Sequence, residues 1–151
     1  MSRVDFYILS DEIRPEKTSV DRFACTIATK AWTNGNRVNI HTQSEEIATV
    51  LDNLLWTYRD ISFVPHEMFD GSCNDETPVT IGYGDHFPDQ SQVMINLDTE
   101  VPGFAANFDR VVEIVGGNES NKQYARQRYQ QYKKEHYEIH DHKIDKLKAY
   151  G

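Results

Sequence analysis

The stretch Arg3-Val-Asp-Phe-Tyr-Ile-Leu9 is rich in β-branched and aromatic residues, and this composition predicts a β-strand. After a polar segment that contains Pro15, apolar residues recur between Val20 and Ala31 at the spacing of a helix with one buried face. Ser19 is placed to cap this helix, and Asn34-Gly35 is placed to end it. The sequence therefore predicts a strand followed by an amphipathic helix.

The alternation of strand and helix continues along the chain. Thr42 and Glu45 match a capping box at the start of a second helix that runs to Trp56, and Glu119 or Ser120 begins a last helix. Extended segments are expected at 37–41, 61–66, 79–83, 93–97 and 110–115. Strands that alternate with helices at this spacing are typical of βαβ units and a parallel sheet. We therefore expect a three-layer α/β/α fold with a mostly parallel sheet of about five strands.

The length of 151 residues is that of one domain with a single core. Residues 1–135 are expected to form this domain, and residues 136–151 are expected to form a polar extension of the last helix or a tail. His136, His140 and His142 fall in this segment, and the first two would share a helix face. Because no cysteine or carboxylate partner is fixed nearby, we interpret these histidines as part of an exposed tail and predict no metal site.

The N-terminal residues predict a cytoplasmic protein. They lack the apolar core of a signal peptide, and the longest apolar runs of the chain are too short to span a bilayer. Cys25 falls within the apolar pattern of the first helix and is expected to be a buried free thiol. Cys73 lies in a polar loop, and a disulfide between the two cysteines is not expected in a reducing compartment.

The turn after the first strand argues against nucleotide binding. In doubly wound folds, glycines in that turn let backbone amides approach a phosphate group. Here residues 10–15 contain no glycine, and the carboxylates of Asp11 and Glu12 would repel phosphate. We therefore expect a doubly wound topology without the phosphate loop of nucleotide-binding folds, and we predict no bound cofactor.

Acidic residues that follow strands leave one enzymatic alternative open. Asp11, Glu12, Asp85 and His86 lie where sites form in doubly wound folds, and carboxylate oxygens can hold a divalent metal. Solvated acidic loops are the commoner explanation of such residues. A small metal- or nucleotide-dependent enzyme is therefore the alternative function.

The charge of the chain is unevenly distributed. The whole sequence holds 16 Lys and Arg against 24 Asp and Glu, yet residues 121–151 hold eight basic and four acidic residues. On a helix, Lys122, Arg126, Tyr129 and Lys133 would share one face. This cationic stripe fits an acidic segment with an apolar end, although a solvated helical tail also gives such a pattern. The net charge of -8 makes direct contact with single-stranded DNA a secondary possibility.

Five segments occur in a characteristic order across nearly the whole chain. They are Asp5-Phe-Tyr-Ile-Leu9, Gly35-Asn-Arg-Val38, Leu51-Asp-Asn-Leu-Leu-Trp56, Ser62-Phe-Val-Pro-His66 and Lys122-Gln-Tyr-Ala-Arg-Gln-Arg-Tyr129. Together they resemble the chi subunit family of bacterial DNA polymerase III. The resemblance implies an accessory subunit without catalytic activity, which bridges two proteins in DNA replication. One is the psi subunit of the clamp-loader complex, and the other is the acidic C-terminal tail of single-stranded-DNA-binding protein, which ends in Ile-Pro-Phe.

The resemblance also implies two sets of contact residues. Lys122 and Arg126 would pair with carboxylates of the tail, and the other tail-binding residues would be Val115, Gln123, Tyr129 and Lys133. The psi contact maps onto Trp56, Phe63, Val64, Pro65 and His66, although Trp56 and Phe63 would also suit a core. For Tyr124 and Tyr132 we expect packing of the last helix onto the sheet. Gly116-Gly117 departs from the family's bulkier loop beside the proposed pocket.

Overall fold

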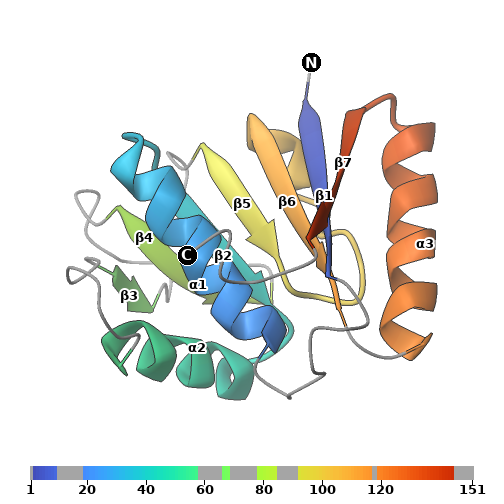
Figure 1. The fold of residues 1–151 in the computed structure, drawn as a ribbon. Helices are drawn as coiled ribbons and strands as arrows, with labels where there is room; N and C mark the ends of the chain where they lie inside the picture. Colours follow the sequence, from blue (N-terminus) through green and yellow to red (C-terminus); the bar gives the residue numbers. More distant parts are fainter. Residues whose placement is uncertain are drawn as a thin grey trace.

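The structure is a computed structural model that describes residues 2–9, 19–57, 66–68, 78–84, 92–116 and 119–144. Within these ranges, strands and helices alternate along the chain (Figure 1). The elements are β1 (Arg3–Leu9), α1 (Ser19–Thr33), β2 (Val38–Thr42), α2 (Glu45–Thr57), β3 (His66–Met68), β4 (Val79–Tyr83), β5 (Val93–Asn96), the 3₁₀ turn η1 (Ala105–Asn107), β6 (Arg110–Val115), α3 (Glu119–Lys134) and β7 (Glu138–Ile144).

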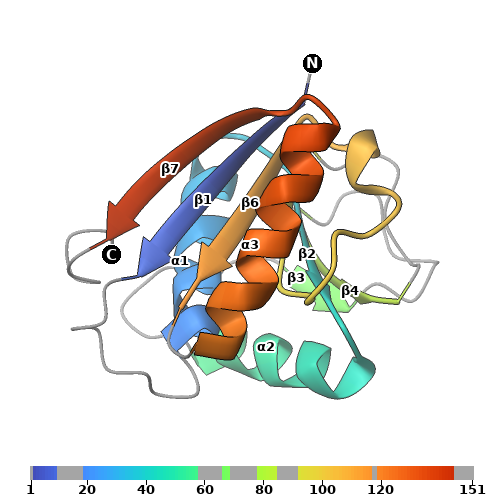
Figure 2. The same cartoon turned by 90° about the vertical axis from the view of Figure 1, so that its right-hand side faces the viewer.

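The strands form one sheet in the order β3-β4-β2-β5-β6-β1-β7, and each neighbouring pair is parallel. Helices α1 and α2 cover one face of this sheet, while α3 and η1 cover the other (Figures 1 and 2). The predicted three-layer α/β fold with a parallel sheet is therefore confirmed. The sheet has seven strands among the described residues, so the expected number of about five was too low.

Strand β7 is the main difference from the expected fold. We predicted a polar helix extension or tail from residue 136, but residues 138–144 pair in parallel with β1 at the edge of the sheet. His136 has a positive φ of 65°, which ends α3 in the left-handed conformation and turns the chain back. A strand at the edge of a sheet is half exposed, so its polar residues conceal the alternation that identifies inner strands.

The helix ends follow local backbone chemistry. Gly35 takes a φ of 88° after α1 and donates its N–H to the carbonyl of Trp32, which confirms the predicted stop. The predicted capping box of α2 was wrong, because Thr42 is the last residue of β2. Instead, the hydroxyl of Ser44 accepts a hydrogen bond from the N–H of Ile47 at 3.4 Å.

Apolar residues form one cluster on each face of the sheet. Under α1 and α2, the cluster includes Phe23, Ile40 and Leu51, all fully buried. Under α3 and η1, it includes Phe6 and Tyr132. Cys25 lies on the buried face of α1, and burial raises the pKa of its thiol to about 12, which confirms the predicted buried thiol.

Gly116 follows β6 at the point where α1 approaches the sheet. A Cβ atom at this position would lie 2.6 Å from Cγ2 of Val20, which is too close for a non-bonded contact. A larger residue would therefore displace the first turn of α1. The glycine that departs from the family pattern allows close packing of α1 against the end of β6.

A buried carboxylate links the three strands at the β7 side of the sheet. Asp5 of β1 accepts hydrogen bonds from Arg3 and from Nε of Arg110 at 2.6 Å, and Nε2 of His142 lies 2.8 Å from its Oδ1. Burial alone would raise the pKa of Asp5. The hydrogen bonds from these three partners outweigh burial and lower its pKa from 3.8 to about 2.

Replacing Asp5 with asparagine is expected to lower the free energy of unfolding at neutral pH by about 2 kcal/mol, since the carboxylate has a lower pKa in the folded than in the unfolded chain. This stabilisation is fully present above the unfolded value of 3.8 and is lost as the pH falls towards about 2. Urea denaturation of both proteins across this pH range measures the effect. An Asp5→Asn variant that loses stability with acid as steeply as the wild type would contradict this account.

Candidate peptide-binding groove between α3 and the sheet

Helix α3 presents two differently used faces. Its buried residues Ala125, Arg128 and Tyr132 follow one another at three- and four-residue spacing and face the sheet. Lys122, Arg126 and Tyr129 follow at four and three residues, so they lie along one flank of the same helix. The described structure places this flank beside β1, β6 and β7.

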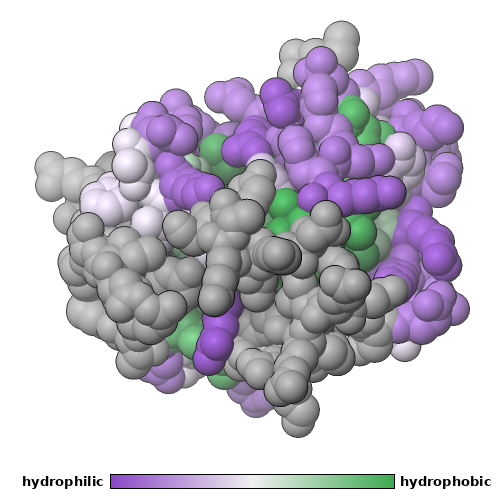
Figure 3. All heavy atoms as spheres, viewed as in Figure 1, coloured by the Kyte–Doolittle hydropathy of each residue, from purple (hydrophilic) through white to green (hydrophobic). Residues whose placement is uncertain are grey.

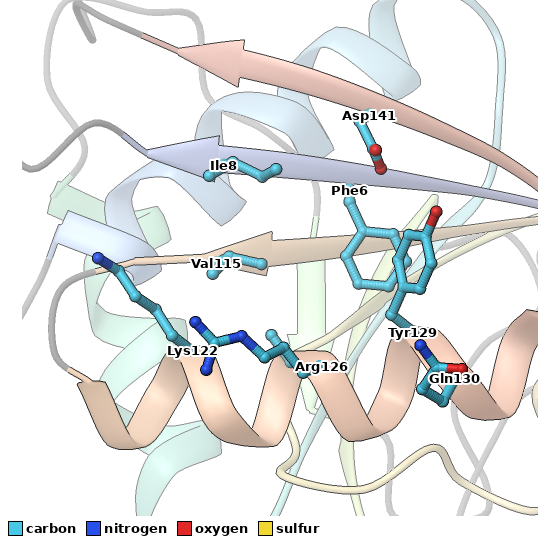
Figure 4. A pocket seen from close by; sticks show the side chains of 9 residues that line it. Phe6, Ile8, Val115, Lys122, Arg126, Tyr129, Gln130 and Asp141 are labelled. Atoms are coloured by element: carbon cyan, nitrogen blue, oxygen red, sulfur yellow. The ribbon is translucent and has the colours of Figure 1, made fainter.

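A groove with a cavity volume of about 310 Å³ runs along this flank (Figure 4). Its apolar floor is formed by Phe6 and Ile8 of β1 and Val115 of β6. The two strands place these side chains on the α3 face because alternate residues of a strand point to the same side. The floor is therefore a continuous apolar surface beneath the helix flank.

Tyr129 closes the aromatic end of the groove. Its ring lies 5.3 Å from that of Phe6, between centroids, with an interplanar angle of 52°. Gln130 lines the groove from the same turn of α3, and Asp141 lines it from β7 (Figure 4). Phe6 is only 2% exposed, so it supports the ring of Tyr129 from beneath, and the half-buried Tyr129 supplies the accessible aromatic surface.

The cations of the groove lie towards its other end (Figure 4). Lys122 is the fourth residue of α3, and Arg126 follows about one turn later. The guanidinium of Arg126 lies 3.6 Å from the carboxylate of Glu119, and both side chains are more than two-thirds exposed. An ion pair this exposed contributes little, so an anionic ligand can replace Glu119 as the partner of Arg126.

The structure brings together four of the six residues predicted to bind the tail: Val115, Lys122, Arg126 and Tyr129 line the groove. Gln123 and Lys133 are exposed on α3 but are not part of its lining. Tyr132 is fully buried, which confirms its predicted packing.

Tyr124 is 44% exposed, so the prediction that it packs on the sheet was wrong. It precedes the buried Ala125, and its position in the helix turns it away from the sheet.

Sequence reasoning missed five lining residues: Phe6, Ile8, Ala125, Gln130 and Asp141. The alternation within the first strand gives a signal for Phe6 and Ile8, since both share the face that the last helix covers. Ala125 and Gln130 neighbour the predicted stripe along the helix. Asp141 had no signal, because its position depends on the edge strand β7.

Arg128 belongs to a buried network beneath the groove helix. Its Nε donates to Oε1 of Glu113 at 2.8 Å, and its Nη1 donates to the carbonyl of Thr99 at 3.1 Å. The hydroxyl of Tyr132 and the amide of Asn96 donate to Oε2 of Glu113 at 2.7 Å and 2.9 Å. Burial raises the pKa of Glu113, against the opposing effect of Arg128. The network fixes α3 on the sheet and thereby positions the groove.

Most residues of the second predicted contact set lie outside the described part of the chain. This is the case for Phe63, Val64 and Pro65, and for the side chain of Trp56, whose backbone belongs to α2. His66 begins β3, and its buried imidazole lies 3.3 Å from the carboxylate of Asp52. The metal candidates Asp11, Glu12, Asp85 and His86, together with Cys73, also lie outside the described residues.

The three C-terminal histidines, His136, His140 and His142, have different surroundings. His142 contacts Asp5, His140 lies 3.6 Å from the carboxylate of Glu138, and His136 occupies the turn before β7. Within the described ranges, no three His, Cys, Asp or Glu side chains are grouped as metal ligands would be.

No helix in those ranges is both long and apolar enough to cross a membrane. In the space-filling view, the described surface on the α3 side is predominantly hydrophilic (Figure 3).

Comparison with solved structures supports the fold. A chain in the crystal structure of T4 UvsW superposes with a TM-score of 0.63 at 7% sequence identity. The match covers 95% of this chain and 41% of that chain. Identity this low shows a shared fold and nothing about activity.

Comparison of sequences identifies the family. The family described as DNA polymerase III chi subunit, HolC, matches residues 1–140. The DNA polymerase III subunit chi of Pseudomonas aeruginosa is 34% identical over 147 residues, which cover 97% of this chain and all of the relative. That of Escherichia coli is 33% identical over 135 residues, covering 88% of this chain and 92% of the relative. The chain therefore belongs to the chi subunit family of DNA polymerase III.

Proposed function

We propose that the chain is a non-catalytic adaptor of the replicative polymerase, which binds the acidic C-terminal tail of single-stranded-DNA-binding protein in the α3 groove. The observation that carries this proposal is the groove itself. It combines the exposed guanidinium of Arg126 and the ammonium of Lys122 with an apolar floor of Phe6, Ile8 and Val115. An acidic peptide with an apolar end is complementary to both parts.

The chemistry of each part supports this ligand class. The aromatic end of the tail would pack against Tyr129, whose ring rests on the buried Phe6, since aromatic residues supply much of the energy of such contacts. Arg126 can bind a carboxylate through two parallel hydrogen bonds, which Lys122 cannot do. A single short peptide gives a weak and salt-sensitive contact, but many tails on coated DNA raise the overall affinity through avidity.

The proposed bridging function requires a second contact that leaves the groove accessible. Strand β3 forms one edge of the sheet and β7 the other, so His66 and the end of α2 lie across the sheet from the groove (Figure 1). We propose the psi contact at that distant edge, beside the end of α2 and the start of β3. The side chain of His66 is buried, so it would position the backbone there without itself contacting psi.

Assembly on coated DNA tests the adaptor function. A single-stranded oligonucleotide is immobilised and coated with single-stranded-DNA-binding protein, either complete or without its acidic tail, and retention of this chain is measured. We expect retention on the complete protein alone, and retention of added psi only when this chain is present. Equal retention on both coats would overturn the tail contact. Failure to retain psi would overturn the bridge.

A further inference from the structure

Strand β7 forms the third wall of the groove. Ile139, Asp141 and Lys143 are register partners of Val4, Phe6 and Ile8, so this alternate set of β7 residues lies on the α3 face of the sheet. Asp141 lines the groove, and Figure 4 shows its carboxylate pointing towards Tyr129. The match to the family ends at residue 140, so both charged residues of this set lie beyond it.

Of the two charged residues of this set, Asp141 lines the groove and Lys143 lies outside its lining. Asp141 is the register partner of Phe6, at the aromatic end, whereas Lys143 is the register partner of Ile8, two residues further along the strands. Lys122 lies towards that same end, beside Val115 (Figure 4). Both Asp141 and Lys143 are exposed and make no ion pair among the described residues. The groove therefore has a cationic end and an aromatic end that carries a carboxylate.

The uneven charge of the groove affects the direction in which a charged peptide can bind along it. A tail with aspartates followed by an apolar C-terminus could run along the groove in either of two directions. In one direction its aspartates lie between Lys122 and Lys143 and its aromatic ring lies at Phe6. In the other direction its aspartates lie beside Asp141, and like charges in contact are unfavourable.

We propose that Asp141 and Lys143 determine a single orientation of the bound tail, with its aspartates at the Lys122 end and its aromatic ring at the Phe6 end. This inference rests on the proposed function and assigns β7 a specificity-determining role in it. Arg126, between the two ends, binds the terminal carboxylate. Lys143 attracts the aspartates, and Asp141 disfavours the reversed peptide.

A comparison of two peptides tests the orientation. Fluorescent peptides ending in Asp-Asp-Ile-Pro-Phe and Asn-Asn-Ile-Pro-Phe are titrated at low salt into the wild type, Lys143→Ala and Asp141→Asn. Lys143→Ala is expected to weaken the aspartate peptide about threefold and to leave the asparagine peptide within about a factor of 1.5, as for other exposed ion pairs. Asp141→Asn is expected to change the affinity for both peptides by the same small factor.

The opposite pattern would overturn the orientation. If Asp141→Asn strengthens the aspartate peptide alone while Lys143→Ala affects both peptides equally, the aspartates lie at the Phe6 end. Equal effects of both substitutions on both peptides would also overturn the proposed orientation, since neither Asp141 nor Lys143 would then interact specifically with the aspartates of the peptide. Lys134→Ala is the control for net charge, because this exposed lysine lies in the last turn of α3, at the opposite end of the helix from Lys122.

Failure of the proposed function gives a distinguishable result. If the wild type binds neither peptide, or if Arg126→Ala binds as tightly as the wild type, the groove is not the tail site and the orientation falls with it. If the wild type binds and Arg126→Ala does not, the groove is the tail site. The effects of Asp141→Asn and Lys143→Ala on the two peptides then test the orientation by themselves.

Discussion

Replacing Arg128 with alanine is expected to lower the free energy of unfolding by about 3–5 kcal/mol, the usual cost of removing one partner of a buried ion pair. The guanidinium is buried against Glu113, whose carboxylate is fully buried. Without Arg128, the donors that remain to this carboxylate among the described residues are the neutral groups of Asn96 and Tyr132. The carbonyl of Thr99 also loses its hydrogen bond. Urea denaturation followed by circular dichroism measures the change.

Arg126→Ala is the matched control for this experiment. Arg126 lies two residues away on the same helix, and within the described ranges its ion-pair partner is the exposed Glu119, at 3.6 Å. We therefore expect its replacement to change stability by less than about 0.5 kcal/mol. Equal stability losses for the two variants would show that Arg128 is not the buried anchor of α3.

The same Arg126→Ala substitution is expected to weaken binding of the Asp-Asp-Ile-Pro-Phe peptide at least about tenfold, because a hydrogen-bonded pair with a charged group is worth roughly 1.5–3 kcal/mol. The loss should shrink as salt is added, since the interaction is partly exposed. Fluorescence anisotropy of the labelled peptide measures both effects.

Lys134→Ala again serves as the control for the peptide experiment, since it removes one positive charge from α3 outside the groove. It should reduce affinity less than about twofold. If Arg126→Ala and Lys134→Ala weaken binding equally, the peptide responds to the general charge of the helix, and Arg126 has no specific role in the groove.

Arg126 and Arg128 show which features of α3 can be predicted from the sequence and which cannot. Helical spacing correctly placed Lys122, Arg126 and Tyr129 on one flank, because a period of 3.6 residues can be read without tertiary structure. The buried role of Arg128 depends on the carboxylate of Glu113 and the carbonyl of Thr99, which both lie outside α3. Pairing between distant residues leaves no local pattern, so the sequence alone could not separate the structural arginine from the exposed one.

Strand β7 illustrates the same limit for the fold. The inner strands are apolar and could be predicted from composition, as for β1, β4, β5 and β6. The sequence of β7 contains Glu138, Asp141 and Lys143 and resembles a solvated tail. It forms a strand because β1 offers a parallel edge and because His142 reaches Asp5. The contribution of β7 to the groove could therefore not be predicted before the strand order of the sheet was known.

Mapping the bound peptide onto the chain tests the location of the groove most directly. The isotope-labelled protein is titrated with the unlabelled Asp-Asp-Ile-Pro-Phe peptide, and changes in amide chemical shifts are assigned along the sequence. The predicted result is that the largest changes fall on residues 6–8, 115, 122–130 and 141, while α1 and α2 on the opposite face remain unchanged. Changes concentrated on α1 and α2, or no changes at saturating peptide, would contradict the assignment of this groove as the binding site.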